Sequence, residues 1–537
     1  MKKRCIVIPA IKKNAVIPDQ LVKKLAGITL IERAINTARA CESGQDIIVL
    51  TDSEEIGLIC ERHGVRFRRD SSLHFKSLDI VSEMTALLGE LAAEYENCII
   101  LRASCPLLTW VDIENAWKDY IGAGAEGLVT VRNVRQRIWK MTDNALSALE
   151  DEAGEREYLV ESRALIMLAL KNFLGKTPKK PARTIPFFLS ERSIEIQNYQ
   201  DWWICEHLLR RRHLVFVVAG YPAIGMGHVY RALMLAHEIS NHKISFVCTR
   251  ESELAVESVA SRDYPVVRQG SEDLAQTVLG LAPDLVISDF LDTSAEYMQA
   301  LGNIPKVNFE DEGEGAALAD LVINALYEDG DNSSAKRSGP EYFCLRDEFV
   351  NAARNPLRDA VKTLLITFGG TDQFDGTRRI LDIVEPVCRE RGIAIRIVAG
   401  PGYAHREKLE KHLQRLANPL IEFTWATNIM SRMMEGADLA ICSAGRTVYE
   451  LAHMRVPAIV LATHEREARH TFARAANGFA FGGILGRASD EKIRRIFLKM
   501  LDQKTRAKYW ERQNRLDFGG NKARVVNLIE NLLHKEN

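Results

Sequence analysis

The sequence predicts an α/β protein made of one domain followed by two facing lobes. Short β-branched runs alternate with helical patterns along the 537 residues, and strands that alternate with helices of about ten or more residues form parallel sheets. The segment Tyr327 to Pro356 is rich in Asp, Asn, Ser, Gly and Pro, and is expected to include a hinge. We therefore predict a first domain at 1–210, a first lobe at 211–345 and a second lobe at 346–537.

Three sets of apolar runs give the expected strands in chain order. The first set is Cys5 to Pro9, Ile47 to Leu50, Cys98 to Leu101 and Gly127 to Val131. The second set is Leu214 to Ala219, Ile244 to Thr249, Leu285 to Ser288, Lys306 to Asn308 and Leu321 to Asn324. The third set is Leu364 to Phe368, Ala394 to Ala399, Ile421 to Thr424, Leu439 to Cys442 and Ala458 to Leu461. Because ligands of such sheets bind at the carboxyl ends of strands, the turns after these runs are the candidate sites.

Composition places the chain among ordinary globular proteins, with 46% hydrophobic and 27% charged residues. Its 71 basic residues are balanced by 72 acidic residues, so no overall field favours nucleic acid or an anionic membrane surface, although local basic clusters still count. Ten cysteines are scattered singly, which is typical of reduced, buried cysteines. No run approaches the roughly 18 apolar residues of a membrane span. We expect a cytoplasmic protein that does not bind nucleic acid.

A glycine-flanked histidine follows the first strand of the second set. The turn Gly225-Met226-Gly227-His228 comes after the apolar run from Leu214 to Gly220 and opens an amphipathic helix from Val229 to Ile239. His228 would thus lie near a helix N-terminus, where the dipole disfavours the imidazolium and keeps the ring able to accept a proton. The alternative is a plain glycine turn with a half-buried histidine.

Two glycine clusters end strands of the third set. One includes Gly369, Gly370 and Thr371, and the other runs from Ser443 through Gly445, Arg446 and Thr447 to Glu450. Glycines at such positions let backbone N–H groups approach a diphosphate, and a helix N-terminus favours its charge. Glu450, one turn into the helix, is placed to accept hydrogen bonds from ribose hydroxyls. Each cluster alone is equally well explained as a helix-start turn.

Residues 213 to about 535 resemble the GT-B-fold hydrolases of pseudaminic acid synthesis, which are cousins of the MurG-type N-acetylglucosaminyltransferases. The resemblance rests on GxGHxxR, FGGTD, the run from Ala437 to Leu451 and Val456-Pro457. Those enzymes cleave a UDP-linked diacetamido-trideoxyhexose into sugar and UDP. The resemblance implies that His228 activates water, that the glycine loops at Gly225, Gly227, Gly369, Gly370 and Gly445 hold the nucleotide, and that Glu450 binds the ribose.

The same resemblance implies polar substrate contacts in the first lobe. Arg231 is the last residue of GxGHxxR, and Asp289, Asp311 and Asn324 lie at strand ends. Asp289 and Asp311 are equally well explained as strand-end caps. The resemblance implies no cofactor for this half of the chain.

One segment departs from the hydrolase pattern. Where the hydrolases have an Asn-Gln pair, this chain reads Thr463-His464-Glu465-Arg466-Glu467-Ala468-Arg469-His470. His464 and Glu467 would supply charged or polar groups near the sugar, suited to an acidic or differently substituted substrate, or to an acceptor in place of water. The alternative for this charge run is a solvated helix start.

Residues 1 to about 210 resemble the acylneuraminate cytidylyltransferases, which join CTP to a nonulosonic acid and release pyrophosphate. The matching segments are Ile6 to Ala10, Leu25 to Ile31, Val49 to Ile56 with Asp52, Arg102 to Leu107 with Ser104, and Ser193 to Ile196 before Asp201 and Glu206. The resemblance implies a Rossmann-like nucleotidyltransferase (GT-A-like) fold. It also leaves open a homodimer formed through this domain.

The residues that bind the phosphates and the metal in that family are matched less well in this chain than the segments that define its fold. Its phosphate loop has a glycine and a serine where this chain has Ile11-Lys12-Lys13-Asn14, so Lys12 and Lys13 either replace the lost contacts or are solvated loop residues. Its paired metal-binding aspartates correspond to Glu195 and Gln197, which would hold Mg²⁺ less well. Its Asn-Gly near the sugar is replaced by Glu161-Ser162. An altered cytidylyltransferase and a silent scaffold domain both remain open, and we favour weak or lost activity.

The first interpretation is a nucleotide-sugar enzyme of nonulosonic acid (pseudaminic or legionaminic type) or surface-glycan synthesis. Its C-terminal half would hydrolyse a UDP-amino sugar, and its N-terminal domain would be a divergent cytidylyltransferase with CTP or a CMP-sugar as ligand. The second interpretation is a GT-B glycosyltransferase in which His228 deprotonates an acceptor hydroxyl. The third is a nucleotide-sugar-binding scaffold with both sites inactive.

Overall fold

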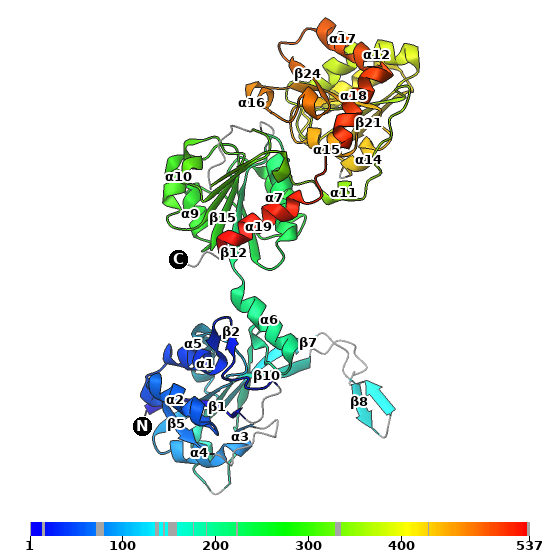
Figure 1. Cartoon of the computed structure of the whole chain (residues 1–537). Helices are drawn as coiled ribbons and strands as arrows, with labels where there is room; N and C mark the ends of the chain where they lie inside the picture. Colours follow the sequence, from blue (N-terminus) through cyan, green and yellow to red (C-terminus); the bar gives the residue numbers. More distant parts are fainter. Residues whose placement is uncertain are drawn as a thin grey trace. The chain divides into compact units, whose positions relative to one another are not determined.

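The computed structural model describes residues 2–12, 17–70, 80–134, 139–142, 145–148, 158–175, 177–189, 191–221, 224–327, 335–427 and 429–533. The chain divides into two compact units, Met1–Arg211 and Arg212–Asn537, and each is described by itself (Figure 1).

The first unit is a seven-stranded sheet covered by helices. The strands, in spatial order, are β11 (Thr184–Phe188), β7 (Gly127–Val134), β10 (Tyr158–Ala169), β6 (Tyr95–Leu101), β1 (Lys2–Ala10), β4 (Ile47–Thr51) and β5 (Arg66–Arg69). The helices are α1 (Leu30–Arg39), α2 (Glu54–Arg62), α3 (Ile80–Glu83), α4 (Thr85–Leu91), α5 (Trp110–Gly122) and α6 (Tyr199–Arg210). Two short hairpins complete the unit, β2 (Lys24–Leu25) with β3 (Ile28–Thr29) and β8 (Trp139–Thr142) with β9 (Ala145–Ala148).

Local sequence fixes the helix starts beside this sheet. Thr29 begins α1 with a capping box, in which its side chain accepts from the N–H of Glu32 and the Glu32 carboxylate accepts from the N–H of Thr29. Thr109 and Asp112 do the same at α5. The expected parallel sheet is wrong in one respect. Strand β10 runs antiparallel to both β6 and β7, so the first sheet is mixed.

The first lobe of the second unit is a parallel, seven-stranded sheet. Its spatial order is β14 (Val266–Arg268), β13 (Lys243–Cys248), β12 (His213–Val218), β15 (Leu285–Asp289), β16 (Lys306–Phe309), β17 (Leu321–Asn324) and β18 (Lys336–Ser338). Its helices are α7 (Gly227–Glu238), α8 (Glu253–Ala260), α9 (Leu274–Leu279) and α10 (Ala295–Ala300). Strand β12 is buried along its whole length and pairs with β13 on one side and β15 on the other.

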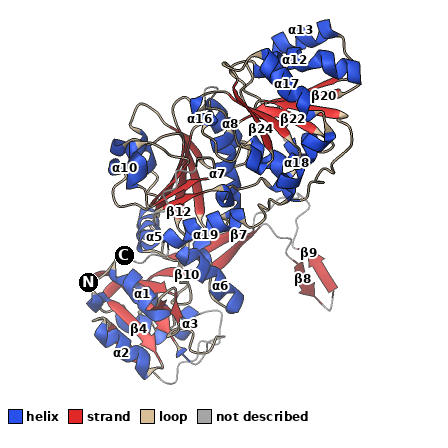
Figure 2. Cartoon of the chain, turned by 45° about the horizontal axis from the view of Figure 1, so that its top comes forward, coloured by secondary structure: helices blue, strands red, loops and turns tan. Residues whose placement is uncertain are grey.

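The second lobe is a parallel, six-stranded sheet with helices on both faces (Figure 2). Its order is β21 (Ile421–Trp425), β20 (Ala394–Ala399), β19 (Thr363–Thr367), β22 (Leu439–Ser443), β23 (Ala458–Ala462) and β24 (Phe479–Ile484). Its helices are α12 (Gly376–Arg391), α13 (Arg406–Leu416), α14 (Met430–Met434), α15 (Thr447–His453), α16 (Glu465–Ala468), α17 (Asp490–Met500) and α18 (Gln503–Asn514).

The two lobes share core residues where the hinge was expected. Helix α11 (Asp347–Val350) and the residues around it pack into the core of the second lobe. The Tyr449 ring lies between the Phe343 and Phe472 rings, with centroids 4.0 and 3.9 Å away. The last helix, α19 (Asn521–Leu533), returns to the first lobe, where Val525 and Ile529 are buried with α7. The predicted range 346–537 therefore includes a helix that packs on the first lobe.

The described parts of the chain confirm the α/β fold class and each strand expected in the three sets, with strand ends that differ by three residues at most. The ten cysteines are free thiols, of which Cys41 is half-buried and the others are buried. Among the described residues, no helix is both long and apolar enough to cross a membrane.

Candidate functional site

The turn that carries His228 is shaped by its glycines. Gly225 has φ +79°, a left-handed conformation that favours glycine, and its N–H donates to the carbonyl of Tyr221. Helix α7 then begins at Gly227, so His228 lies in its first turn. A Cβ at Gly227 would lie 3.2 Å from Cδ of Arg446 in the second lobe. The turn therefore lies against the opposite lobe, as predicted for a site at strand ends.

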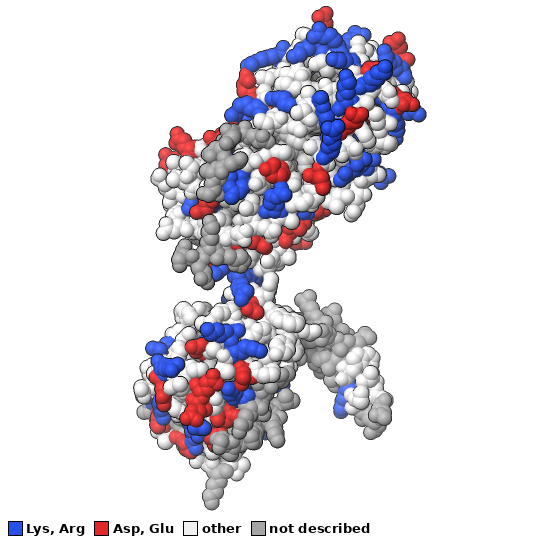
Figure 3. Space-filling model, in the orientation of Figure 1, with Lys and Arg blue, Asp and Glu red and all other residues white. Residues whose placement is uncertain are grey.

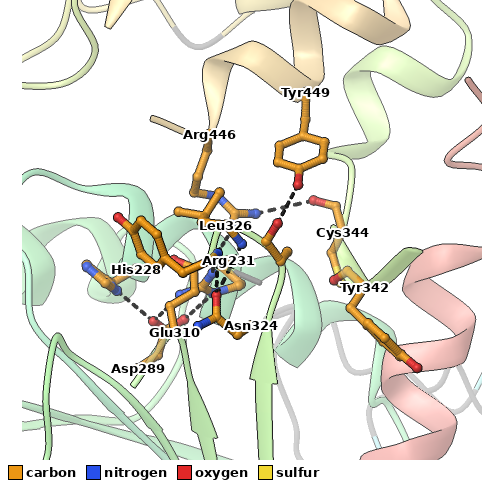
Figure 4. Close-up of polar contacts among 12 residues, drawn as sticks. His228, Arg231, Asp289, Glu310, Asn324, Leu326, Tyr342, Cys344, Arg446 and Tyr449 are labelled. Carbon is orange, nitrogen blue, oxygen red and sulfur yellow. Dashed lines mark hydrogen bonds and ion pairs between the residues drawn. The ribbon is translucent and has the colours of Figure 1, made fainter. Parts of the chain in front are cut away.

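His228 is paired with the buried carboxylate of Asp289 (Figure 4). The imidazole Nδ1 lies 2.7 Å from Oδ1 of Asp289, the last residue of β15, whose exposed fraction is 0%. In the neutral tautomer with its proton on Nδ1, the ring donates to Asp289 and turns the lone pair of Nε2 outward. That arrangement is the one a general base needs.

Arg231 holds Asp289 in place. Its Nε donates to Oδ2 at 2.7 Å and its Nη2 donates to Oδ1 at 2.6 Å, while Nη1 bonds Glu310. The Arg231 side chain is 3% exposed and lies over the Phe309 ring. Burial alone would raise the pKa of Asp289, but the Arg231 charge and then His228 lower it to about 2. Arg231, predicted to contact substrate, is thus engaged by two buried carboxylates.

Asp311 and Asn324 cap loops of the first lobe. The Asp311 carboxylate accepts from the N–H and Oγ1 of Thr293 at 3.0 and 2.6 Å and from Nδ2 of Asn308 at 2.6 Å. Oδ1 of Asn324 accepts from the N–H groups of Leu326 and Tyr327 at 3.2 and 2.9 Å. These contacts support the strand-end-cap alternative for Asp311. Asp289, in contrast, is a partner of the histidine.

The first glycine loop of the second lobe reaches the His228 turn. Gly369 has φ +80°, and a Cβ at Gly370 would lie 3.6 Å from the nitrogen of Met226. Thr371 is half-buried beside it. The next residue, Asp372, caps α12 by accepting from the N–H groups of Gly376 and Thr377, each at 2.8 Å. The Gly369-Gly370 loop of the second lobe and the His228 turn of the first lobe thus place glycine backbone of the two lobes side by side.

The second glycine loop supplies one charged side chain, Arg446, that faces the first lobe. Ser443 ends β22, Gly445 follows, and Thr447 begins α15. Nη2 of Arg446 donates to the carbonyl of Cys344 at 3.3 Å, and its Nη1 lies 3.6 Å from Oε1 of Glu310. Burial, and then the nearby Arg231 charge, lowers the pKa of Arg446.

Glu450 is a buried acceptor with a cationic partner. Its Oε1 accepts from Nε of Arg346 at 2.8 Å, and Arg346 also pairs with Glu348 at 2.7 Å. Burial alone would lower the pKa of Arg346, but Glu450 and then Glu348 raise it. A ribose at Glu450 would share the carboxylate with Arg346.

The charge run after Thr463 links the two lobes. Arg466 donates from Nη1 to both oxygens of Asp292 at 2.8 Å and from Nη2 to the carbonyl of Glu310 at 2.7 Å. Arg469 donates to Glu312 at 3.0 Å. These cations bind carboxylates of the first lobe, so this part of the run is neither a plain solvated helix start nor a set of free charges.

The two residues of this run that we predicted to contact the sugar have different surroundings. His464 is exposed at the N-cap of α16. The Glu467 carboxylate accepts from the N–H and Oγ1 of Thr463, each at 2.7 Å. A Cβ at Gly445 would lie 3.7 Å from Oε1 of Glu467, which places that carboxylate beside the second glycine loop.

The predicted phosphate-loop cation of the first unit lies among carboxylates. Nζ of Lys12 is 2.7 Å from Glu55 and 3.1 Å from Asp19, and the Lys12 N–H donates to Asp52 at 2.7 Å. Lys13 lies outside the described residues. Lys12 is therefore shared with acidic neighbours in the loop that would meet a triphosphate.

Glu195, the candidate metal ligand, is held by arginines. Its Oε1 accepts from Arg102 at 2.7 Å and from the Ser104 hydroxyl at 3.3 Å, and Oε2 lies 3.6 Å from Arg163 and 3.2 Å from the Gln197 amide nitrogen. A carboxylate between two guanidinium groups is already neutralised, so this donor set does not fit Mg²⁺. Among the described residues, no group of three or more His, Cys, Asp or Glu side chains is placed to hold a metal.

Comparison with known families finds a match in each half of the chain. Residues 6–219 match the cytidylyltransferase family model. Residues 363–478 match the C-terminal domain model of glycosyltransferase family 28. The predicted resemblances to cytidylyltransferases and to glycosyltransferases are thereby confirmed. The chain joins a cytidylyltransferase-type domain to a glycosyltransferase-type domain, both of enzyme families.

Two curated relatives are similar over about half of the chain. An uncharacterized protein of Methanocaldococcus jannaschii is 27% identical over 47% of this chain, and the match spans 56% of that relative's length. The spore coat polysaccharide biosynthesis protein SpsG of Bacillus subtilis is 27% identical over 48% of this chain and 80% of SpsG. Among solved structures, Acinetobacter baumannii MurG is 17% identical with a TM-score of 0.44, covering 60% of this chain and 99% of MurG.

Several residues at the junction of the lobes were not predicted from the sequence. Glu310 bonds Arg231, lies near Arg446 and accepts Arg466 at its carbonyl, and it has φ +53°, which is uncommon for a residue with a side chain. Arg346 bonds Glu450 from the expected hinge. The position of Glu310 directly after β16 was an available signal, because polar residues at strand ends of such sheets line sites.

Proposed function

We propose that the C-terminal unit cleaves the glycosidic bond of a UDP-amino sugar, with His228 as the general base and water as the nucleophile. The observation that supports this most is the 2.7 Å contact between His228 and the buried Asp289, at the point where the glycine turns of the two lobes meet. A general base must be oriented and close to the groups that bind the leaving nucleotide.

In this reaction Asp289, Arg231 and the glycine loops would each have a separate role. Asp289 keeps the Nδ1 proton of His228 and stabilises the imidazolium that forms when Nε2 takes a proton from water. Arg231 keeps Asp289 ionised and fixes its two oxygens. Backbone N–H groups around Gly369, Gly370 and Gly445 would face the diphosphate, whose charge grows as the bond to the sugar breaks.

For the N-terminal unit, we propose a divergent cytidylyltransferase with low activity toward CTP. The Lys12 ammonium is shared by Asp19 and Glu55, and Glu195 is occupied by Arg102 and Arg163. Neither group is then free to meet a triphosphate or a metal. The relation of 48% of the chain to a spore coat polysaccharide biosynthesis protein supports a place in surface-glycan synthesis, for which we propose a cytoplasmic location.

The test is UDP release from a panel of UDP-amino sugars by the full-length chain, with His228→Ala as the variant. General-base catalysis contributes about 10² to 10⁴ in rate, so turnover should fall by that order while UDP affinity stays nearly unchanged. His237→Ala is the matched control, because His237 is exposed on the same helix. Loss of UDP binding in His228→Ala would instead indicate a structural role.

A glycosyltransferase is the second candidate, supported by the match of residues 363–478 to the glycosyltransferase family 28 model. In that reaction His228 takes the proton of an acceptor hydroxyl. UDP release only in the presence of an acceptor, abolished by His228→Ala, would favour transfer over hydrolysis.

A further inference from the structure

The last residue of the charge run after Thr463 is buried against the second glycine loop. His470 has an exposed fraction of 0%, and its Nδ1 lies 2.7 Å from the carbonyl oxygen of Ala444. Because a carbonyl oxygen can only accept, Nδ1 carries the proton and donates. Burial lowers the pKa of His470 to about 4. At neutral pH the ring therefore has a single N–H, and that N–H is engaged by Ala444.

Nε2, the other ring nitrogen of His470, is buried and forms no hydrogen bond with any residue that the structure describes. The rings of Tyr449, Tyr327 and Phe472 lie around the imidazole, with centroids 5.6, 6.4 and 6.5 Å from its own. Burying an unpaired acceptor costs free energy, which an apolar side chain in the same aromatic surroundings would avoid. Stability alone therefore does not explain a histidine at this position, whereas a need for the N–H donor does.

A second buried histidine of the same lobe has a contact at each ring nitrogen. His453 is the last residue of α15, and its Nε2 lies 3.0 Å from the carbonyl oxygen of Phe349. Its Nδ1 lies 3.5 Å from Nη2 of Arg354. Both contacts are with the segment that precedes the second lobe, and neither is with a glycine loop. His453 is thus a structural histidine and a matched control for His470.

The bond from His470 fixes the peptide group between Ala444 and Gly445. The described residues contain no cis peptide bond, and in a trans peptide group the carbonyl and the N–H point in opposite directions. The N–H of Gly445 therefore points away from His470. It donates to no acceptor among the described residues, and Gly445 is half-buried rather than enclosed.

That N–H belongs to the region where the two glycine loops meet. A Cβ at Gly445 would lie 3.8 Å from Oγ of Ser443, and a Cβ at Gly369 would lie 3.9 Å from the same atom. Unpaired backbone N–H groups in such loops bind anions. A donor that is held in one direction before the ligand arrives binds more tightly, because it does not have to be ordered on binding.

We propose that His470 is a positioning residue, which binds the Ala444 carbonyl and so holds the Gly445 N–H toward the diphosphate of the nucleotide. Because His470 is fully buried, it acts through the peptide group and does not touch the nucleotide. This inference rests on the proposed binding of a UDP-sugar at the glycine loops, and is independent of the role of His228.

The test is the binding of UDP and of uridine to the full-length chain, measured by calorimetry. His470→Leu removes the N–H donor but keeps an apolar side chain. UDP should then bind about tenfold or more weakly, as expected for the loss of one hydrogen bond to a charged group. The affinity for uridine, which has no phosphate, should stay unchanged. His470→Asn should restore most of the UDP affinity, because the Asn amide nitrogen, like Nδ1, is bonded to Cγ.

His453→Leu is the control, because it loses a buried contact of the same kind and should bind both ligands as the natural chain does. Exposed Lys and Arg side chains are spread over the visible face of the second lobe (Figure 3). Such charges attract a diphosphate without any help from His470. Titration at about 0.15 M salt, where the Debye length is about 8 Å, limits this background.

A second measurement tests the geometry without nucleotide. Nitrogen NMR of the isotope-labelled histidine side chains, assigned with His470→Asn, should show His470 protonated at Nδ1 and unprotonated at Nε2 at neutral pH. A proton on Nε2, equal UDP affinity of His470→Leu and the natural chain, equal loss of UDP and uridine binding in His470→Leu, or equal UDP loss in His470→Leu and His470→Asn would overturn the proposal. UDP binding that depends on His470, without cleavage of any UDP-sugar, would overturn the proposed function and support this inference.

Discussion

Replacing Asp289 by Asn tests the buried charge network that holds the proposed base. Asn keeps the shape of the side chain but removes the charge that faces Arg231 and His228. Arg231 is then left with Glu310 as its buried anionic partner. Removing one member of a buried ion pair typically costs about 3 to 5 kcal/mol, so the second unit should become less stable by that order at neutral pH.

The dependence of stability on pH gives a sharper test of the same contact. The pKa of Asp289 falls from 3.8 to about 2 in the folded chain, because Arg231 and His228 outweigh the effect of burial. Since one pKa unit is worth about 1.4 kcal/mol, Asp289 contributes about 2 kcal/mol of folding free energy. Because the folded pKa is the lower one, this contribution is complete above the unfolded pKa and is lost as the pH falls toward 2.

The assay is urea unfolding at several pH values from about 7 to about 3. Pulsed hydrogen exchange, measured by mass spectrometry on peptides from residues 212–537, reports the unfolding of the second unit separately from that of the first. Asp289→Asn should lose less stability on acidification than the natural chain does. Asp311→Asn is the control, because its carboxylate contacts neutral donors and its loss leaves the Arg231 pair intact. The reasoning fails if the natural chain and Asp289→Asn have the same acid profile.

Three further expectations follow from the site. Glu450→Ala should weaken UDP binding about tenfold or more, because charged hydrogen bonds to the ribose are lost; an unchanged Kd in calorimetry would remove Glu450 from the nucleotide site. The N-terminal unit should release pyrophosphate from CTP slowly with any nonulosonic acid, and rapid Mg²⁺-dependent release would show that its departures are adaptations. Arg466→Gln and Asp292→Asn should each cost under about 1 kcal/mol and should not be additive in the double variant; full additivity would mean that the pair across the lobes contributes nothing.

The fold was predictable where strands are buried on both sides. The runs that became β12 and β22 are buried throughout, and burial on both faces gives a continuous apolar signal in the sequence. Strand β5, Arg66–Arg69, has the sequence RFRR and lies at a sheet edge, so it offers no such signal. The antiparallel direction of β10 could not be predicted from the sequence either. The direction of a strand depends on how the chain connects it to its neighbours, and the residues of the strand itself do not show this.

The site was predictable in its glycines and its histidine, but not in its pairing. Gly225 marks the turn because its left-handed backbone conformation favours glycine, which is a local property. The contact between His228 and Asp289 arises because β15 pairs with β12 in a register that places Asp289 opposite Val218, the last residue of β12. That register joins residues far apart in the chain. A sequence read alone could therefore propose Asp289 as a strand-end cap or a substrate contact, but not as the partner of His228.

The charge network also connects the second glycine loop to His228, the proposed base. Arg446 lies at the second glycine loop, yet its guanidinium faces Glu310 at 3.6 Å and the carbonyl of Cys344. The other contact of the Glu310 carboxylate is with Arg231, which in turn fixes Asp289. A diphosphate bound at Arg446 would draw that cation away and leave Glu310 to Arg231 alone. Because Arg231 orients the partner of His228, nucleotide binding at Arg446 would affect His228 through four contacts: Arg446 with Glu310, Glu310 with Arg231, Arg231 with Asp289, and Asp289 with His228.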